Sequence, residues 1–409
     1  MLRIIDASQA EELITRKAVR LSEAESVVAP ILDDIRRRGD VALLEYARKF
    51  DGFEGATVAV STDEDAPVSG AYLRALDIAS RNIREYARMQ MPRESWTEFP
   101  DGRRLGQIVR PLDSMGAYIP AGRYPLPSTL LMTVIPAQVA GVANICVACP
   151  NPGPEILAAF QFLGSGRMFR MGGAQAIAAF AFGTETVPKV DRIVGPGNIY
   201  VAAAKKLLAG EVGIDFVAGP TEIALVAEEG EPPHIAADML AQAEHDVDAS
   251  SILLTTSRSL AERVAAEVDQ QLSTLPTAPV ACEAIRKNSA VVLVRDIEEA
   301  MQLVNRLAPE HLAIPDKKHL PLVRNAGSVF VGPYSPEAAG DYASGPNHVL
   351  PTSGAARIRG GLSAADFVKV ISVQELTLDA LRELAPAITT LARAEGLEAH
   401  ARSVEVRCG

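Results

Sequence analysis

The sequence predicts an α/β protein whose largely parallel sheets are covered by helices. The first observation is an alternation of short apolar runs, typical of buried strands, with longer stretches typical of helices. The strands are expected at 144–149, 167–171, 191–194, 214–218, 223–227, 250–256, 290–295 and 328–331. The second observation is length: 409 residues exceed what one simple core usually holds, so two or more domains are expected.

Composition narrows the classes of function. Hydrophobic residues make up 48% and charged residues 22%, which is typical of a compact soluble protein. The net charge of −11 argues against a nucleic-acid or anionic-membrane partner, because either would need a basic face. The start of the chain turns polar too early for a signal peptide. Proline repeatedly interrupts the uncharged run 124–154, which therefore indicates buried α/β core rather than a membrane span.

Mostly helices are expected before the alternation begins. Residues 1–20 predict a short arm with a first helix, and 22–50 predict further helices opened by a capping box. An amphipathic helix is expected at 69–90, and an Asp-Gly pair within 96–109 indicates a hairpin. Towards the C-terminus, helices are expected at 366–373 and 376–393, followed by a polar tail.

Two glycine-rich turns are candidate phosphate sites. Gly172-Gly173 and the turn 195–198 each open a predicted helix, and free N–H groups at helix starts suit phosphate or pyrophosphate. The alternative is that both are simply tight strand-to-helix turns. No GxGxxG follows a strand, so a standard dinucleotide fingerprint is absent. The strand 115–118 runs into a Pro/Gly loop ending at Gly122, an edge where α/β proteins place ligands.

A helix at 233–245 carries the first group of polar side chains. Asp238, Gln242 and His245 follow one another at spacings of four and three, so they share one helix face. A carboxylate, an amide oxygen and an imidazole aimed together suit zinc or a similar ion. The alternative is structural, because the helix dipole alone favours a histidine near a helix C-terminus.

Three further sites contain histidine. Glu310-His311 lies at the start of an apolar run, where a carboxylate beside an imidazole suits acid–base chemistry, although a polar loop edge is the alternative. Asp341 and His348 bound a loop of small residues and suit metal or substrate binding, although turn residues explain much of that loop. His400 lies in the terminal tail.

The four cysteines indicate the cellular compartment of the protein. Cys146 and Cys149 form a CxxC, but they fall on a predicted buried strand, where residues three apart point to opposite faces. Buried free thiols are therefore expected rather than a metal or redox pair. We expect a reducing, cytoplasmic environment.

Six ordered segments together resemble the histidinol dehydrogenase family over nearly the whole chain. They read GGAQAI (172–177), VDRIVGPGN (190–198), AGPTE (218–222), QAEH (242–245), APEHL (308–312) and GDYASGPNHVLPT (340–352). The resemblance implies a zinc-dependent, four-electron oxidation of L-histidinol through L-histidinal to L-histidine with two NAD⁺. It also implies an intertwined homodimer with one zinc per subunit.

The resemblance implies a fold of two Rossmann-like parallel-sheet domains lacking GxGxxG, with an N-terminal arm and a helical C-terminal tail. The boundaries would be an arm at 1–20, a larger domain at 21–117 and 221–362, an inserted NAD-binding domain at 118–220, and a tail at 363–409 that contributes to the partner's site.

Site roles are also implied by the resemblance, position by position. Zinc ligands would be Gln242, His245, Asp341 and, across the dimer, His400. Glu310 and His311 would be the catalytic pair. Tyr118, Gln175 and Asn198 would contact NAD. Substrate contacts would be Thr221, Gln242, His245, His311, His348, Asp341, Glu395 and His400.

Some positions depart from the family pattern. Ala121 stands where the family often has glycine, which removes a position that adopts positive φ freely. Thr221 replaces a frequent serine but keeps the hydroxyl, and Pro346 replaces a small polar residue before His348. None of these changes removes a catalytic group. The alternatives are a related zinc-dependent dehydrogenase of another small polar alcohol, such as a sulfonated diol, and a metal-binding or regulatory module without turnover.

Overall fold

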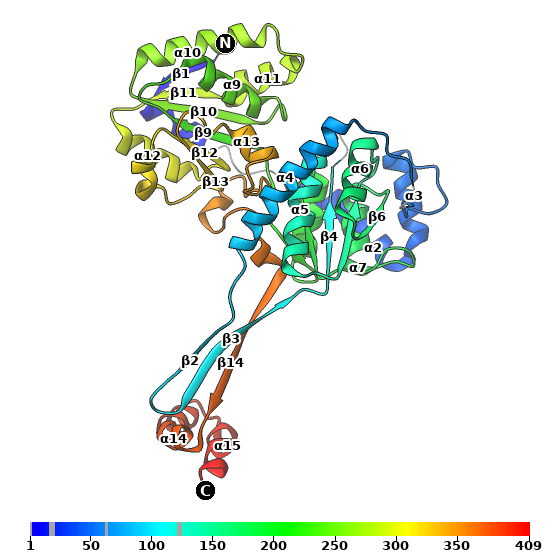
Figure 1. The fold of residues 1–409 in the computed structure, drawn as a ribbon, viewed down its shortest axis with the longest axis vertical. Helices are drawn as coiled ribbons and strands as arrows, with labels where there is room; N and C mark the ends of the chain where they lie inside the picture. The colour runs from blue at the N-terminus through cyan, green and yellow to red at the C-terminus, as the bar shows by residue number, and fades with distance from the viewer. Residues whose placement is uncertain (1, 16–20, 62–63, 121–124) are drawn as a thin grey trace. The chain divides into compact units, whose positions relative to one another are not determined.

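The computed structural model describes residues 2–15, 21–61, 64–120 and 125–409 (Figure 1). The chain divides into two compact units. The first comprises Met1–Gln90 with Asp113–Phe367, and the second Met91–Leu112 with Val368–Gly409. The predicted α/β class is confirmed. No helix in the described ranges is long and apolar enough to cross a membrane.

A six-stranded, all-parallel sheet carries the residues of greatest chemical interest. Its order is β1-β11-β10-β9-β12-β13. The strands are β1 (Arg3–Asp6), β9 (Glu222–Val226), β10 (Ser250–Thr255), β11 (Ala290–Leu293), β12 (His311–Ile314) and β13 (Ser328–Val331). Sequence analysis predicted no strand within 1–20, yet Arg3–Asp6 pairs with β11 at the sheet edge.

Helices cover both faces of this sheet because its strands are apolar on both sides. Alternate residues of β9, such as Leu225 and Val226, belong to two different cores. One core joins the sheet to α9 (Pro232–Ala243), α10 (Arg258–Leu272) and α11 (Ala278–Asn288). The other joins it to α1 (Glu11–Thr15) and α12 (Ile297–Leu307).

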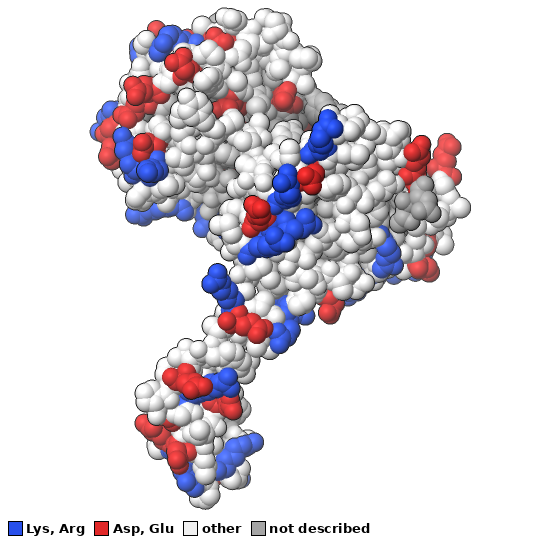
Figure 2. Space-filling model, in the orientation of Figure 1, with Lys and Arg blue, Asp and Glu red and all other residues white. Residues whose placement is uncertain are grey.

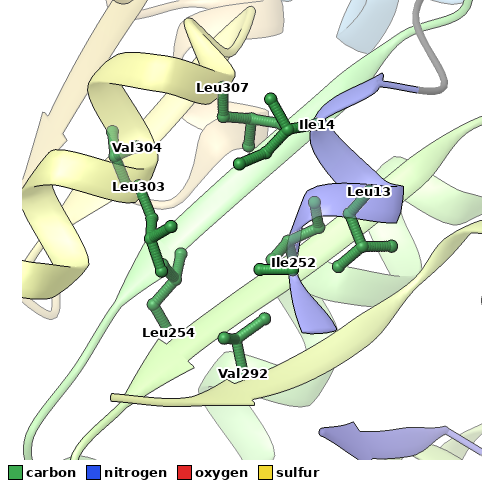
Figure 3. A pocket seen from close by; sticks show the side chains of 9 residues that line it. Leu13, Ile14, Ile252, Leu254, Val292, Leu303, Val304 and Leu307 are labelled. Atoms are coloured by element: carbon green, nitrogen blue, oxygen red, sulfur yellow. The ribbon is translucent and has the colours of Figure 1, made fainter. Parts of the chain in front are cut away.

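The second core contains a small cavity of about 20 Å³ between α1, α12 and the sheet. Figure 3 shows Leu13 and Ile14 facing Ile252, Leu254 and Val292 across it. All the lining side chains are apolar, and a space of this size holds about one water molecule. It is a packing gap without groups that could orient a polar substrate.

A five-stranded parallel sheet forms the other part of the first unit, in the order β6-β5-β4-β7-β8. The strands are β4 (Ser114–Tyr118), β5 (Asn144–Ala148), β6 (Arg167–Phe169), β7 (Arg192–Val194) and β8 (Gly213–Ile214). The expected strand at 214–218 was too long. The carboxylate of Asp215 accepts from the N–H groups of Gly195 and Phe216, which draws the chain out of the sheet.

Helices from two distant parts of the sequence cover this sheet. Its own crossovers supply α5 (Pro127–Ala140), α6 (Pro154–Leu163), α7 (Gly173–Phe182) and α8 (Ile199–Leu208). Residues of α2 (Leu21–Arg38) and α3 (Asp40–Asp51) share one core with α7 and α8, whereas α4 (Gly70–Met89) packs against α5. Because α5 is buried nearly all round, its sequence is uncharged.

The second unit is a three-stranded antiparallel sheet with two helices. β2 (Ser95–Glu98) and β3 (Arg103–Pro111) form the predicted hairpin, and β14 (Val368–Leu376) pairs along all of β3. The helix expected at 366–373 was wrong, because the β-branched residues there pair with β3. The next expected helix is confirmed as α14 (Leu378–Ala394), and α15 (Glu398–Cys408) follows it.

Candidate active site

Polar side chains converge where β9 and β12 begin. These strands are neighbours in the six-stranded sheet, and His311 lies opposite Ile223 in their register. Glu310 therefore comes next to Thr221, just before the two strands. Gln242 reaches the same place from α9, and α13 (Glu337–Tyr342) brings two more carboxylates. The structure thus assembles residues that are more than a hundred positions apart in the sequence.

His311 is the centre of this cluster, with its side chain 4% exposed. Its Nδ1 lies 3.4 Å from the backbone oxygen of Glu222 and 3.4 Å from a carboxylate oxygen of Glu337. Both neighbours accept hydrogen bonds and favour a proton on Nδ1, while the Gln242 amide nitrogen, 3.2 Å from the same atom, favours a lone pair there. Among the described residues, Nε2 has no hydrogen-bond partner, and Asp341 Oδ1 lies 3.7 Å away, at ion-pair distance. Nδ1 therefore has close polar neighbours, whereas Nε2 has no hydrogen-bond partner among the described residues.

Carboxylates dominate the electrostatics around His311. Burial alone would lower the pKa of His311, but Glu337, Glu310 and Asp341 outweigh it and raise the pKa to about 10. Burial alone would raise the pKa of Asp341, yet the interaction with His311, with contributions from His348 and His245, holds that pKa below its usual value. Three carboxyl groups around one imidazole suit the cluster to a cation once they are deprotonated.

Glu310 is buried beside Thr221. Its Oε2 accepts a hydrogen bond from the Thr221 hydroxyl and another from the backbone N–H of Glu222 at 3.0 Å. Burial raises the pKa of Glu310, although the charge of His311 and these two hydrogen bonds oppose the rise. A carboxyl whose pKa moves towards neutrality is suited to accept and return a proton.

Gln242 joins Thr221 to Glu337. Its amide nitrogen is assigned to the Glu337 side, where it donates to Oε1 at 2.5 Å, because the reverse orientation would point oxygen at a carboxylate. Its amide oxygen then accepts from the Thr221 hydroxyl at 2.5 Å, and because that hydroxyl carries one proton, Gln242 and Glu310 compete for it. The predicted ligand Gln242 is therefore in the cluster.

His245 and His348 have defined proton positions. His245 Nδ1 lies 2.9 Å from the Ala241 carbonyl and His348 Nδ1 lies 2.7 Å from the Asp341 carbonyl, so each Nδ1 donates. This leaves a lone pair on each Nε2. The Nε2 of His348 lies 3.3 Å from the Thr129 hydroxyl, and burial lowers the pKa of His348. A histidine that donates through Nδ1 to a carbonyl is the usual arrangement for a metal ligand.

A second donor group overlaps the predicted ligands. Ligand atoms of His311, Glu337 and Asp341 all lie within 4.8 Å of one another. Only Asp341 is shared with the predicted set. Glu337 was missed by sequence analysis, although its position four residues before Asp341 on one helix was a readable signal.

Two predicted residues lie in the second unit. Glu395 ends α14, and His400 lies near the start of α15; both are exposed.

Asp238, on the same face of α9 as Gln242, has its pKa raised by burial to about 6.

The predicted cofactor residues surround the glycine turns of the five-stranded sheet. The N–H of Gly173 donates to the hydroxyl of Tyr118 at 3.1 Å. The carboxylate of Asp51 accepts from the N–H of Gly172 at 3.0 Å and from the amide of Gln175 at 3.1 Å. These N–H groups at the start of α7 are already satisfied. This favours the alternative of a tight turn over a phosphate site here.

The second glycine-rich turn, at 195–198, is also held by hydrogen bonds from nearby residues of the chain. Asn198 caps α8 by accepting from the N–H groups of Tyr200 and Val201, both at 3.1 Å. The buried ammonium of Lys205 donates to the Gly195 carbonyl at 2.5 Å and to Asp215 at 2.7 Å. The turn is rigid, and Asn198 already serves it as a cap. The remainder of the predicted loop, Ala121 and Gly122, lies outside the described residues.

No thiol joins the acid–base cluster within the described ranges. Cys146 and Cys149 are buried, as expected, and all four cysteines are free. Burial raises the pKa of Cys146, and it raises the pKa of Cys149 to about 12. Neither thiol is poised as a nucleophile.

Comparisons with known proteins identify the family of this chain. The family model for histidinol dehydrogenase matches residues 14–408. A histidinol dehydrogenase from Geobacter metallireducens is 48% identical, covering 94% of this chain and 92% of the relative. One from Rhizobium meliloti is 45% identical, covering 96% and 94%. A crystal structure of histidinol dehydrogenase from Elizabethkingia anophelis superposes with a TM-score of 0.94 at 38% identity, covering 100% and 98% of the chains.

A more distant likeness concerns the fold alone. An acetylating aldehyde dehydrogenase from Geobacillus thermoglucosidasius has a TM-score of 0.51 at 13% identity. Fold and site together define an oxidoreductase built on an α/β dehydrogenase framework. Within that class, the chain belongs to the histidinol dehydrogenase family, and the predicted resemblance is confirmed.

Proposed function

We propose that this protein oxidises L-histidinol to L-histidine in two steps, with zinc and two NAD⁺. In the first step, alcohol and NAD⁺ give L-histidinal, NADH and a proton. In the second, aldehyde, water and NAD⁺ give the carboxylate, NADH and two protons. The observation that supports this best is the pair at the start of β12: buried Glu310 beside His311, whose Nε2 lacks a hydrogen-bond partner within the described chain.

The residues fit a zinc ion. A carboxylate on Asp341, whose lowered pKa keeps it ionised, an imidazole on His245 oriented through its Nδ1, and an amide oxygen on Gln242 are suitable donors. We assign these residues as ligands, together with His400 from the second copy of a homodimer. When bound, zinc would orient the imidazole and amine of histidinol and offset the Asp341 charge that raises the pKa of His311.

His311 serves both oxidations as the base. Nδ1 stays protonated against Glu222 and Glu337, so Nε2 is the atom that accepts the alcohol proton as hydride leaves to NAD⁺. The same nitrogen accepts the proton of the aldehyde hydrate in the second oxidation. The proposed substrate contacts are the following residues: Thr221, Gln242, His245, His311, Asp341, His348, Glu395 and His400.

Glu310 activates the water that attacks the aldehyde. Its burial and its raised pKa suit proton uptake, and Thr221 fixes the direction of its carboxylate. Retaining the aldehyde in a buried site protects it from side reactions. Tyr118, Gln175 and Asn198 are the proposed NAD contacts. The region 118–220 is the proposed cofactor-binding part of the chain. The predicted boundaries put 21–117 in the larger domain with 221–362, but α2, α3 and β4 belong with the five-stranded sheet. We place the reaction in the cytoplasm because the four cysteines are free.

Glu310→Gln tests this division of labour. We expect oxidation of histidinol to histidinal to fall much less than oxidation of histidinal, which should lose about 10²–10⁴-fold. Single-turnover NADH formation from each substrate separates the steps. Equal losses in the two steps would contradict separate roles for Glu310 and His311. Turnover of a sulfonated diol without histidinol turnover would favour the related alcohol dehydrogenase instead.

A further inference from the structure

Glu337 is a carboxylate that sequence analysis missed and to which the proposed chemistry assigns only a contact with His311. It is the first residue of α13, and its side chain is 1% exposed. A carboxyl group this buried destabilises the fold unless donors surround it. Its neighbours are therefore informative about its purpose.

Two donors face the Glu337 carboxylate. His311 Nδ1 lies 3.4 Å from Oε1, and the Gln242 amide nitrogen lies 2.5 Å from Oε1 and 3.2 Å from Oε2. These donors belong to different elements, β12 and α9. Glu337 contacts His311 through Nδ1 and Gln242 through the amide nitrogen. The proposed base atom, Nε2 of His311, and the proposed ligand atom, the amide oxygen of Gln242, both point away from Glu337.

We propose that Glu337 is the positioning residue that orients the base His311 and the metal ligand Gln242 together. It holds the Nδ1 proton of His311, which leaves Nε2 as the accepting atom. It also holds the Gln242 amide with its oxygen directed away from Glu337. This inference rests on the roles proposed for His311 and Gln242. Single carboxylates that orient a histidine in this way commonly affect rates strongly.

Other atoms near Nδ1 provide the competing explanations. The Gln242 amide nitrogen lies 3.2 Å from Nδ1, and if it donates to that atom the ring proton is on Nε2 and Glu337 does not hold it. The Glu222 backbone oxygen is as close as Glu337, at 3.4 Å, and Glu310 Oε2 lies 3.7 Å away. Glu310 already accepts from Thr221 and from the Glu222 N–H. If the backbone oxygen alone holds the ring, removing the Glu337 charge leaves the ring and its proton in place. These explanations and the proposed role therefore predict different results for one substitution.

Glu337→Gln, which keeps the size and removes the charge, is the test. At saturating zinc we expect kcat for histidinol to fall about 10²–10⁴-fold, with a much smaller change in KM, and zinc affinity to fall about 10–100-fold. Glu337→Asp restores the charge and should retain more kcat than the glutamine variant. Glu298→Gln, an exposed position on α12, is the matched control. A kcat within threefold of wild type in Glu337→Gln, or a glutamine variant better than the aspartate, would overturn the proposal.

A second readout does not depend on activity. In zinc-loaded protein labelled with ¹⁵N-histidine, the His311 signals, identified by their loss in His311→Asn, should show the proton on Nδ1. In Glu337→Gln the two tautomers should mix. An unchanged tautomer overturns the positioning role even if histidinol is oxidised. A shifted tautomer in a protein that does not oxidise histidinol supports positioning and rejects the proposed function.

Discussion

His311→Asn is expected to lower kcat for both oxidations by about 10²–10⁴-fold. The asparagine amide keeps a polar side chain near Glu222 and Glu337 but has no basic nitrogen where Nε2 stood. Both hydride transfers require a proton acceptor at that atom, so neither should be spared. Steady-state and single-turnover NADH formation from histidinol and from histidinal measure the two losses.

The matched control for this variant is His234→Asn on α9, because His234 is exposed and its replacement should leave the rate within about twofold. Zinc content should stay at wild-type level in His311→Asn, since His311 is not among the assigned ligands. Loss of zinc in His311→Asn, with zinc retained in His245→Asn, would instead assign the metal to the group His311, Glu337 and Asp341.

Asp341→Asn is expected to abolish metal binding at ordinary zinc concentrations. Substituting a residue that only supports a ligand commonly costs 10–100-fold in affinity, so loss of a direct carboxylate ligand should exceed about 100-fold. The variant also removes one of the charges that raise the pKa of His311. Zinc affinity by competition with a chelator, and histidinol oxidation with added zinc, measure the effect.

Asp77→Asn on α4 is the control for Asp341→Asn, because its side chain is 57% exposed and pairs with Arg81 at the surface. Figure 2 shows α4 in a region where basic and acidic side chains are mixed. An Asp341→Asn protein that retains zinc at wild-type affinity would exclude this residue from the metal site.

The alternation of apolar runs was sufficient to predict the two parallel sheets, because strands buried on both faces carry a strong local signal. Three elements escaped for identifiable reasons. β1 is a short edge strand whose pairing with β11 joins residues 3–6 to residues 290–293. β14 follows a short 3₁₀ turn, and its pairing with β3 overrode a helical pattern. The strand at 214–218 ended early because Asp215 turns back to Gly195.

The candidate site was predictable residue by residue but not as an arrangement. Sequence patterns gave Glu310, His311 and Gln242, and the structure brings them to one place through the parallel pairing of β9 and β12. Glu337 escaped because one glutamate in a short helix resembles a surface residue; its spacing of four from Asp341 was a weak signal, and its burial is visible only in the structure. Asp51 also escaped, because the group it binds is distant in the sequence: its carboxylate accepts from the N–H of Gly172 at the start of α7, 121 positions later.

The most direct test of the proposed function is the number of NADH molecules formed per L-histidinol by purified protein, with and without a chelator. We predict two NADH per substrate, loss of activity with chelator, and recovery with zinc. One NADH per substrate, with histidinal accumulating, would contradict the two-step oxidation at a single site. Two NADH in the presence of excess chelator, with zinc shown to be absent, would contradict the metal dependence.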